Sequence, residues 1–267
     1  MPVEPAAPER ARELSDNYDD ILRQVDGAAA RRTEGPKPRL VAVSKYKPAS
    51  DILALYEHGV RHFGENYPQE LEGKAKELPS DIAWHFIGAL QSNKAKLLAA
   101  IPNLFAVETL TSVKAANHLH NALSSAPSPR SNPLNVFLQV NTSGEEQKSG
   151  LPALSPSTPS GGLVDLALHV VQKCPTLRLK GLMTIGSFEA STSGERNPDF
   201  ERLKESREAL VAALRERAGA DAVRALEADG GLELSMGMSN DFAEAIEQGS
   251  TNVRVGSSIF GARPPKA

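Results

Sequence analysis

Lys45 follows a short apolar run, residues 40–44, and stands directly before Tyr46-Lys47-Pro48. A surface lysine has a pKa near ~10.4, so it is almost fully protonated at neutral pH and is a poor nucleophile. An apolar wall at the end of a buried strand disfavours the ammonium form and lets the amine attack an aldehyde. The pattern therefore indicates Schiff-base chemistry. For an isolated strand-end lysine, the alternative is a solvated residue that begins a loop.

Two later segments place hydroxyl groups and glycine where a predicted strand turns into a helix. They are Leu234-Ser235-Met236-Gly237-Met238-Ser239-Asn240 and Arg254-Val255-Gly256-Ser257-Ser258. Barrel proteins often bind phosphate at such turns through backbone N–H groups. Gly256 permits close approach of the backbone, while Ser239 and Ser257 can donate hydrogen bonds. Either segment alone is equally well explained by turn and capping chemistry, but the two together favour a phosphate site.

Arg254 alternates with Val253 and Val255, which predicts a buried guanidinium beside the phosphate site. One interpretation is a structural ion pair with a carboxylate at the edge of the core, such as Asp241 or Glu65. The other is a hydrogen bond to the ring nitrogen of a heteroaromatic ligand. Arginine only donates and does not release its proton, so such a ring nitrogen would stay unprotonated and the ring would be a weak electron sink.

Asn66 and His85 also lie near predicted strand ends. Asn66 can both donate and accept hydrogen bonds near the predicted strand ends that carry Lys45 and the phosphate site. His85 alternates with Trp84, so we expect one of them to point into the sheet's enclosed side and the other toward the helices. A lone strand histidine is more often a hydrogen-bonded core residue than a base. The other histidines show no ligand spacing and Cys174 is the only cysteine, so no metal site is predicted.

Eight short apolar segments read as strands and alternate with segments of helical periodicity. The predicted strands are residues 40–44, 60–64, 83–87, 104–107, 135–140, 179–184, 232–235 and 252–255. The predicted helices include residues 51–56, 94–98, 163–171, 200–214 and 242–246, with Ser50 and Ser112 as capping residues. Eight such repeats predict an α/β fold, a single (β/α)8 TIM barrel. A doubly wound open sheet is the alternative, but no Gly-x-Gly-x-x-Gly follows the first strand.

Three further segments complete the predicted organisation. An extra N-terminal helix, residues 8–31, is expected to cover the bottom of the barrel. Serine- and proline-rich residues 152–162 and 189–198 are expected to form loops on the face with the carboxyl ends of the strands. We interpret these loops as tolerated insertions, with a lid as the alternative.

Composition excludes several classes of protein. The chain has 267 residues, of which 40% are hydrophobic and 24% charged, as in a globular protein with a large core. A net charge of -3 gives no reason to expect nucleic acid or an anionic membrane as a partner. The single cysteine excludes an intramolecular disulfide, and no secretory signal or membrane span is recognised. These features predict a cytoplasmic protein.

The motifs taken together resemble one family, the pyridoxal 5'-phosphate (PLP) homeostasis proteins of the YggS type in bacteria and the PROSC type in animals. The matching stretches are Ala42-Val43-Ser44-Lys45-Tyr46-Lys47-Pro48, Phe63-Gly64-Glu65-Asn66-Tyr67, Trp84-His85-Phe86-Ile87-Gly88, Gln91-Ser92-Asn93-Lys94, Gly181-Leu182-Met183-Thr184-Ile185, Leu234-Ser235-Met236-Gly237-Met238-Ser239 and Val253-Arg254-Val255-Gly256-Ser257-Ser258-Ile259-Phe260-Gly261. They occur in the family's order over nearly the whole chain. The resemblance implies a barrel like the N-terminal domain of alanine racemase (PLP fold type III). That barrel would span residues 38–263, between an N-terminal extension (1–37) and a tail (264–267).

The resemblance also implies a cofactor and its contacts. Lys45 and Lys47 share a strand face, so spacing leaves both open as the attachment point, and the resemblance selects Lys45 for the Schiff base with PLP. It places Arg254 toward the pyridine nitrogen and Asn66 near the ring. The phosphate contacts that it implies are Ser235, Met238, Ser239, Gly256 and Ser257. The two serine-rich insertions and Pro68 depart from the common pattern, which affects the shape of the mouth.

The expected function is PLP binding in intracellular vitamin B6 homeostasis, without a catalysed reaction and without catalytic residues. The chain ends soon after the eighth strand, whereas racemases of this barrel type add a second domain that supplies an opposing base. One alternative is a PLP-dependent racemase with Lys45 as one base and Tyr67 or His85 as the other. A second is a Schiff-base or phosphosugar barrel enzyme that uses no PLP. The expected partners are PLP and recipient apoenzymes, and the expected state is a monomer.

Overall fold

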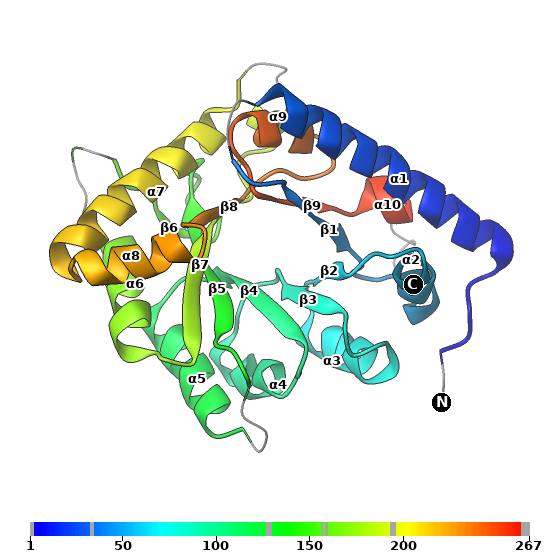
Figure 1. Cartoon of the computed structure of the whole chain (residues 1–267), viewed down its shortest axis with the longest axis horizontal. Helices are drawn as coiled ribbons and strands as arrows, with labels where there is room; N and C mark the ends of the chain where they lie inside the picture. Colours follow the sequence, from blue (N-terminus) through cyan, green and yellow to red (C-terminus); the bar gives the residue numbers. More distant parts are fainter. Residues whose placement is uncertain are drawn as a thin grey trace.

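Eight parallel strands close into a barrel, as the alternating pattern predicts (Figure 1). The computed structural model describes residues 3–32, 35–126, 130–155, 157, 160–192 and 196–262. The barrel strands are β1 (Arg39–Val43), β2 (His62–Glu65), β3 (Ala83–Phe86), β4 (Leu104–Leu110), β5 (Leu134–Asn141), β7 (Leu177–Met183), β8 (Glu233–Ser235) and β9 (Asn252–Val255). Each strand pairs with the next around the ring, and β9 closes it against β1. Residue 263 and the predicted tail lie outside the described residues.

The strands are nearly continuous apolar runs because both of their faces are buried in a closed parallel barrel. β1 and β4 show this, since all but one residue of each is buried. At one position the sequence must be glycine. A Cβ on Gly181 of β7 would lie 2.1 Å from the carbonyl oxygen of Glu233 on β8, so a side chain there would force the two strands apart.

Helices surround the barrel and cover its outer face (Figure 1). Along the chain they are α2 (Ala49–Glu57), α3 (Pro68–Glu77), η1 (Ser92–Lys94), α4 (Ala95–Ala99), α5 (Val113–Ser124), α6 (Gly162–Lys173), η2 (Ala190–Thr192), α7 (Pro198–Arg217), α8 (Ala220–Ala228), α9 (Phe242–Glu247) and α10 (Ser257–Phe260). Ser112 caps α5 as predicted, because its side chain accepts a hydrogen bond from the Ala115 N–H. The prediction for Ser50 is wrong, since α2 already begins at Ala49.

The N-terminal helix α1 (Pro8–Arg31) lies along the flank of the barrel beside α2, α9 and α10, so the prediction that it covers the bottom is wrong (Figure 1). The reason is local. α9 and α10 span only six and four residues and leave part of the flank to be covered by another element. Arg10 fixes the contact by donating to the Asp51 carboxylate at 2.6 Å and to the carbonyl oxygen of Phe260 at 2.9 Å.

The two serine-rich insertions contain some regular structure. Leu151–Pro152 forms β6, a short strand that pairs with β5, and Gly162 begins α6, so the loop prediction for 152–162 is wrong at its first and last residues. The second insertion contains η2. Residues 156, 158, 159 and 193–195 of these segments lie outside the described part.

Apolar side chains fill the space between the barrel and its helices, where Trp84 and Phe63 are both fully buried. The barrel interior is different, with a small apolar cluster of Ala106, Phe137 and Met183 beside a chain of polar groups that includes His85. The opposite facing of Trp84 and His85 is therefore confirmed. Among the described residues, no helix is long and apolar enough to cross a membrane.

Candidate cofactor site at the carboxyl ends of the strands

A cavity of about 260 Å³ opens at the carboxyl ends of β1 and β9, beside the turn that follows β8. Among its lining residues are six that the sequence singles out, namely Lys45, Met238, Ser239, Arg254, Gly256 and Ser257. A neighbouring cavity of about 390 Å³ shares Met238, Ser239 and Ser257 with it and extends to Lys148 and Phe188. The fold thus gathers an amine, a guanidinium and two hydroxyls that are up to 212 positions apart in the sequence (45 to 257).

Lys47 also lines the cavity, but its amine is held by the chain itself. Its Nζ donates to the carbonyl oxygens of Phe260, Gly261 and Ala262 at 3.0, 3.2 and 2.8 Å. Burial, together with the nearby Arg10 charge, lowers the pKa of Lys47. Lys45 is half-buried on the same strand end. Both amines therefore lie at the cavity, and the choice of Lys45 as the residue that reacts with an aldehyde stays a prediction.

The turns after β8 and β9 meet at one side of the cavity. Gly237 has φ +94°, and the Met238 N–H that follows donates to the Asp241 carboxylate at 2.7 Å. The Ser239 hydroxyl accepts from the Gly256 N–H at 3.4 Å and lies 3.3 Å from the Ser257 hydroxyl. Two hydroxyls and the start of a helix, where N–H groups lack partners within the helix, suit an anionic oxygen cluster such as a phosphate.

Ser235 lies outside the lining of both cavities. Its side chain is fully buried, and its hydroxyl donates to the Glu108 carboxylate at 2.5 Å. The same oxygen accepts from Asn252 at 2.9 Å and from Arg254 at 2.5 Å. The implied phosphate contact of Ser235 stays a prediction, and the geometry instead assigns its hydroxyl to the orientation of Arg254.

Asn66 follows β2 and has a buried side-chain oxygen, Oδ1, with no hydrogen-bond partner among the described residues. Such an unsatisfied buried acceptor fits a site that a polar ligand completes. Gly88 fixes the local backbone, since a Cβ there would lie 1.9 Å from the Asn66 carbonyl oxygen. The predicted role of Asn66 near a ring remains a prediction, because Asn66 does not line either cavity.

Arg254 is 4% exposed and bridges the cavity and the barrel interior. Its Nη2 donates to the carbonyl oxygen of Thr184 at 2.7 Å, and its Nη1 lies 3.9 Å from the Glu108 carboxylate. The suggested ion-pair partners Asp241 and Glu65 are therefore wrong. Glu65 pairs with Lys74 instead, and Asp241 acts on Arg254 only through its more distant charge.

Glu108 is the centre of a polar chain inside the barrel. One carboxylate oxygen receives a hydrogen bond from His85 Nδ1 at 2.6 Å, and His85 Nε2 in turn lies 3.0 Å from His62 Nδ1. Burial alone would raise the pKa of Glu108, but the His85 hydrogen bond and the Arg254 charge bring it to about 2. Burial lowers the pKa of His85 and takes that of His62 to about 3. At neutral pH the chain therefore holds one anion, two neutral rings and the Arg254 cation.

His85 is confirmed as a hydrogen-bonded core residue and does not line the cavity. Glu108 is the residue that sequence reasoning missed. Its only signal is a carboxylate within the apolar run of β4. Among the described residues, no group of His, Cys, Asp or Glu side chains could hold a metal ion.

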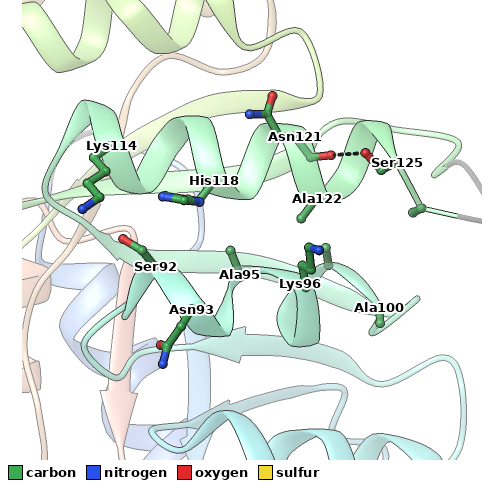
Figure 2. Close-up of a pocket in the computed structure, with 12 residues that line it drawn as sticks. Ser92, Asn93, Ala95, Lys96, Ala100, Lys114, His118, Asn121, Ala122 and Ser125 are labelled. Carbon is green, nitrogen blue, oxygen red and sulfur yellow. Dashed lines mark hydrogen bonds between the residues drawn. The ribbon is translucent and has the colours of Figure 1, made fainter.

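A larger hollow of about 710 Å³ lies away from this site, between α5 on one side and η1 with α4 on the other (Figure 2). Figure 2 shows Lys114 and His118 of α5 opposite Ser92 of η1, with Ala95 and Lys96 of α4 beside it. The hollow brings together none of the predicted cofactor contacts. Size alone therefore does not identify the site in this chain.

Comparison with known proteins gives consistent matches over most of the chain. Residues 21–264 match the family model described as alanine racemase, N-terminal domain. A human pyridoxal phosphate homeostasis protein is 47% identical over 251 residues, which are 91% of this chain and 84% of the relative. The protein of the same name from Schizosaccharomyces pombe is 46% identical over 246 residues, 92% of this chain and 91% of the relative. The structure of PipY from Synechococcus elongatus, solved with PLP bound, has a TM-score of 0.67 and 27% identity, and covers 93% of this chain and 100% of PipY.

Proposed function

The chain belongs to the family of pyridoxal phosphate homeostasis proteins, and from this premise we propose that it holds PLP covalently on Lys45. The cofactor would be stored and passed on in vitamin B6 homeostasis without a catalysed reaction. One observation carries the proposal. A single cavity combines the strand-end Lys45 with Arg254 and with the paired hydroxyls of Ser239 and Ser257.

The residues present fit the chemical parts of PLP. When bound, PLP supplies an aldehyde that condenses with an amine and a ring that withdraws electrons. The hydroxyls of Ser239 and Ser257 and the backbone at Gly256 and Met238 would hold the phosphate. Arg254 would donate toward the ring nitrogen, and the unsatisfied oxygen of Asn66 would meet a polar group of the ring. In the described part of the chain, the lining of this cavity contains no carboxylate that would repel the phosphate.

The lining also supports the absence of catalysis. A racemase needs two positioned proton donors or acceptors on opposite faces of its cofactor. Neither suggested partner of Lys45 is available for this role. His85 is buried between Glu108 and His62, and the exposed Tyr67 hydroxyl is bonded to Tyr46. Among the described residues, no histidine, tyrosine, cysteine or carboxylate lines the cavity.

We further propose a cytoplasmic monomer that delivers PLP to apoenzymes. The entrance to the cavities supports delivery of PLP, because several large apolar side chains remain exposed on loops that follow the strands. Phe188, which is 76% exposed, and Ile185, at 46%, both line the neighbouring cavity. They would give an incoming apoenzyme an apolar contact beside the cofactor.

The proposal is tested by trapping the covalent bond. Protein incubated with PLP is reduced with borohydride, digested and examined by mass spectrometry. We expect the wild type to carry the modification on Lys45, Lys45→Ala to lose it, and the matched control Lys47→Ala to keep it. Lys47→Ala removes three hydrogen bonds to the carbonyls of residues 260–262, so its unfolding midpoint is measured beside that of the wild type to show that it remains folded. Modification of Lys45→Ala at Lys47 would contradict the assignment.

The same proteins test the absence of catalysis. PLP-loaded wild type and Lys45→Ala are incubated with L- and D-amino acids, and the products are separated by chiral chromatography. We expect no difference between the two proteins. Turnover by the wild type above that of Lys45→Ala would favour the racemase alternative.

A further inference from the structure

A buried ionic cluster lies directly beneath the turn that carries Lys45. It consists of Ser44, Glu65, Glu70 and Lys74, and we call it the Lys74 cluster. Lys74 Nζ donates to Glu65 at 2.7 Å and to Glu70 at 2.6 Å, and the Ser44 hydroxyl donates to Glu65 at 2.6 Å. The Lys74 side chain is only 8% exposed and that of Glu65 is fully buried. A buried charge is costly unless it is paired, and Lys74 and Glu65 meet this condition through each other, although the second Glu65 oxygen has no hydrogen-bond partner among the described residues.

The cluster binds the backbone on both sides of Lys45. On one side, the Ser44 carbonyl oxygen accepts from Lys74 Nζ at 2.9 Å. On the other, the Tyr46 N–H donates to the Glu70 carboxylate at 2.7 Å. The two peptide groups that flank the reactive lysine are therefore both held by charged side chains, which form stronger hydrogen bonds than neutral partners do.

The backbone conformation of Tyr46 depends on these hydrogen bonds. Tyr46 has φ +63°, and it is the one non-glycine residue with a positive φ in the described part of the chain. An L-residue with a side chain disfavours this conformation, so it persists only where the surroundings impose it. The Glu70 hydrogen bond and the contact between the Tyr46 and Tyr67 rings impose it here. The strained turn sets the direction in which Lys45 leaves the strand.

We propose that Glu70 and Lys74 are positioning residues for Lys45. They fix its two flanking peptide groups so that its amine faces the aldehyde of PLP. The inference rests on the proposed function, since it concerns how the amine of that same site is aimed. It adds residues of α3, and a backbone strain at Tyr46, to the residues that contact the cofactor.

Glu70 offers the cleaner test, because its side chain is 23% exposed and its loss leaves Glu65 paired with Lys74. Glu70→Ala removes the acceptor for the Tyr46 N–H, whereas Glu70→Gln keeps a carbonyl oxygen at the same reach. Glu72→Ala is the matched control on α3, where Glu72 pairs with the exposed Lys76. The covalently attached fraction is measured at limiting PLP by borohydride trapping and intact mass.

We expect Glu70→Ala to lower the equilibrium constant for attachment about tenfold, as expected for loss of one charge-assisted hydrogen bond to a strained peptide. Glu72→Ala should stay within about twofold of the wild type, and Glu70→Gln, which keeps a neutral acceptor for the Tyr46 N–H, should lie between the wild type and Glu70→Ala. Affinity for pyridoxine 5'-phosphate, which has an alcohol in place of the aldehyde, should change less than about twofold in all of them. An equal loss for the aldehyde and the alcohol would overturn the proposal, because it would indicate a general disturbance of the cavity.

The Lys74 half of the cluster needs a double variant, since Lys74→Met alone would leave the buried Glu65 uncompensated. Lys74→Met with Glu65→Gln removes both charges and frees the Ser44 carbonyl. We expect a similar loss of attachment with retained binding of pyridoxine 5'-phosphate, and unchanged attachment would remove Lys74 from the proposal. A wild type that attaches PLP at another lysine, or at none, would instead refute the proposed function.

Discussion

The buried Arg254 at the candidate cofactor site needs a compensating negative charge, and Glu108 supplies it. Burial lowers the pKa of Arg254, and the charges of Glu108 and Asp241 oppose this effect. Ser235 and Asn252 join the two partners by hydrogen bonds, so the guanidinium is held in one orientation. A buried charge without a partner is strongly destabilising, whereas a neutral pair of similar shape is tolerated. The Arg254 cation at the cavity and the Glu108 anion in the barrel interior therefore depend on each other.

The effects of Arg254 on PLP binding and on stability can be separated. Arg254→Ala removes a donor from the cavity and leaves Glu108 uncompensated, so we expect PLP affinity to fall at least about tenfold and the free energy of unfolding to fall by about 3 kcal/mol. Adding Glu108→Gln removes the uncompensated anion. The double variant should regain about half of the lost stability but none of the affinity.

Urea unfolding of the PLP-free proteins gives the stabilities, and fluorescence titration with PLP gives the affinities. The single variant Glu108→Gln shows how the change from carboxylate to amide alone affects stability and PLP affinity. If the double variant recovers affinity together with stability, Arg254 acts on the cofactor only through the fold, and the proposed contact with the ring is wrong.

At the scale of elements, the site is made by turns whose shape is set by the barrel beneath them. The turn after β8 bends at Gly237, and its carbonyl oxygen accepts from the Arg254 N–H at 3.1 Å, which ties it to β9. A Cβ on Gly237 would lie 2.5 Å from the Ala245 side chain and 3.0 Å from the Phe242 backbone. Glycine is therefore required both for the positive φ and for the close approach of α9.

We predict that Gly237→Ala destabilises the protein more than Gly219→Ala does. The two glycines have φ +94° and +90°, but a Cβ on Gly219 meets no atom within 4 Å. Both changes carry the conformational cost of about 1 kcal/mol, and Gly237→Ala adds about 1–3 kcal/mol of overpacking. Urea unfolding midpoints check this difference. Because Met238 and Ser239 follow the bend, PLP affinity should fall only in Gly237→Ala, and equal effects in both variants would contradict this account.

The sequence predicts which residues follow the strand ends and meet at the cavity. It does not predict which buried polar side chains support them from below. The convergence of Lys45, Ser239 and Ser257 on one cavity was predictable, because hydroxyls and an amine that follow apolar strands meet at one face of a parallel barrel. Glu108 and Lys74 were not, because their partners lie on other elements and neither residue stands at a strand end. α8 was also missed, although Ala220–Ala228 has helical periodicity, because it follows α7 after a break of only two residues.

At the scale of the whole molecule, alternation of strand and helix sufficed to predict a closed barrel, since eight parallel strands leave few other arrangements. The alternation of strand and helix does not show which side chains fill the barrel interior. An ion pair of Arg39 with Glu233, at 2.7 Å, and the chain from His62 to Arg254 place polar groups where apolar layers are usual. Which polar residues face each other across a barrel depends on its register and closure, and these follow from tertiary pairing rather than local sequence.

The interior chain predicts that acid destabilises the barrel well above the range in which most carboxylates titrate. Burial, with the charges of His85 and Arg39, lowers the pKa of His62 to about 3, and burial lowers that of His85. Below pH 6.5 the unfolded chain takes up protons that the folded chain excludes, so stability is full above that pH and is lost as the pH falls. Glu108, with a pKa of about 2, adds a loss in the same direction between pH 4.5 and 2.

We expect the free energy of unfolding to fall between pH 7.5 and 5.5, by at most about 1.4 kcal/mol per pH unit for each neutral histidine. His62 faces His85, Arg39, Glu108 and Phe105, and His62→Asn removes its titration while keeping a hydrogen-bonding group. This variant should lose less stability over that interval in urea unfolding than the wild type does. His118→Asn, at an exposed position on α5, should follow the wild type. Parallel pH profiles for wild type and His62→Asn would show that the interior histidines do not control the acid sensitivity of the barrel.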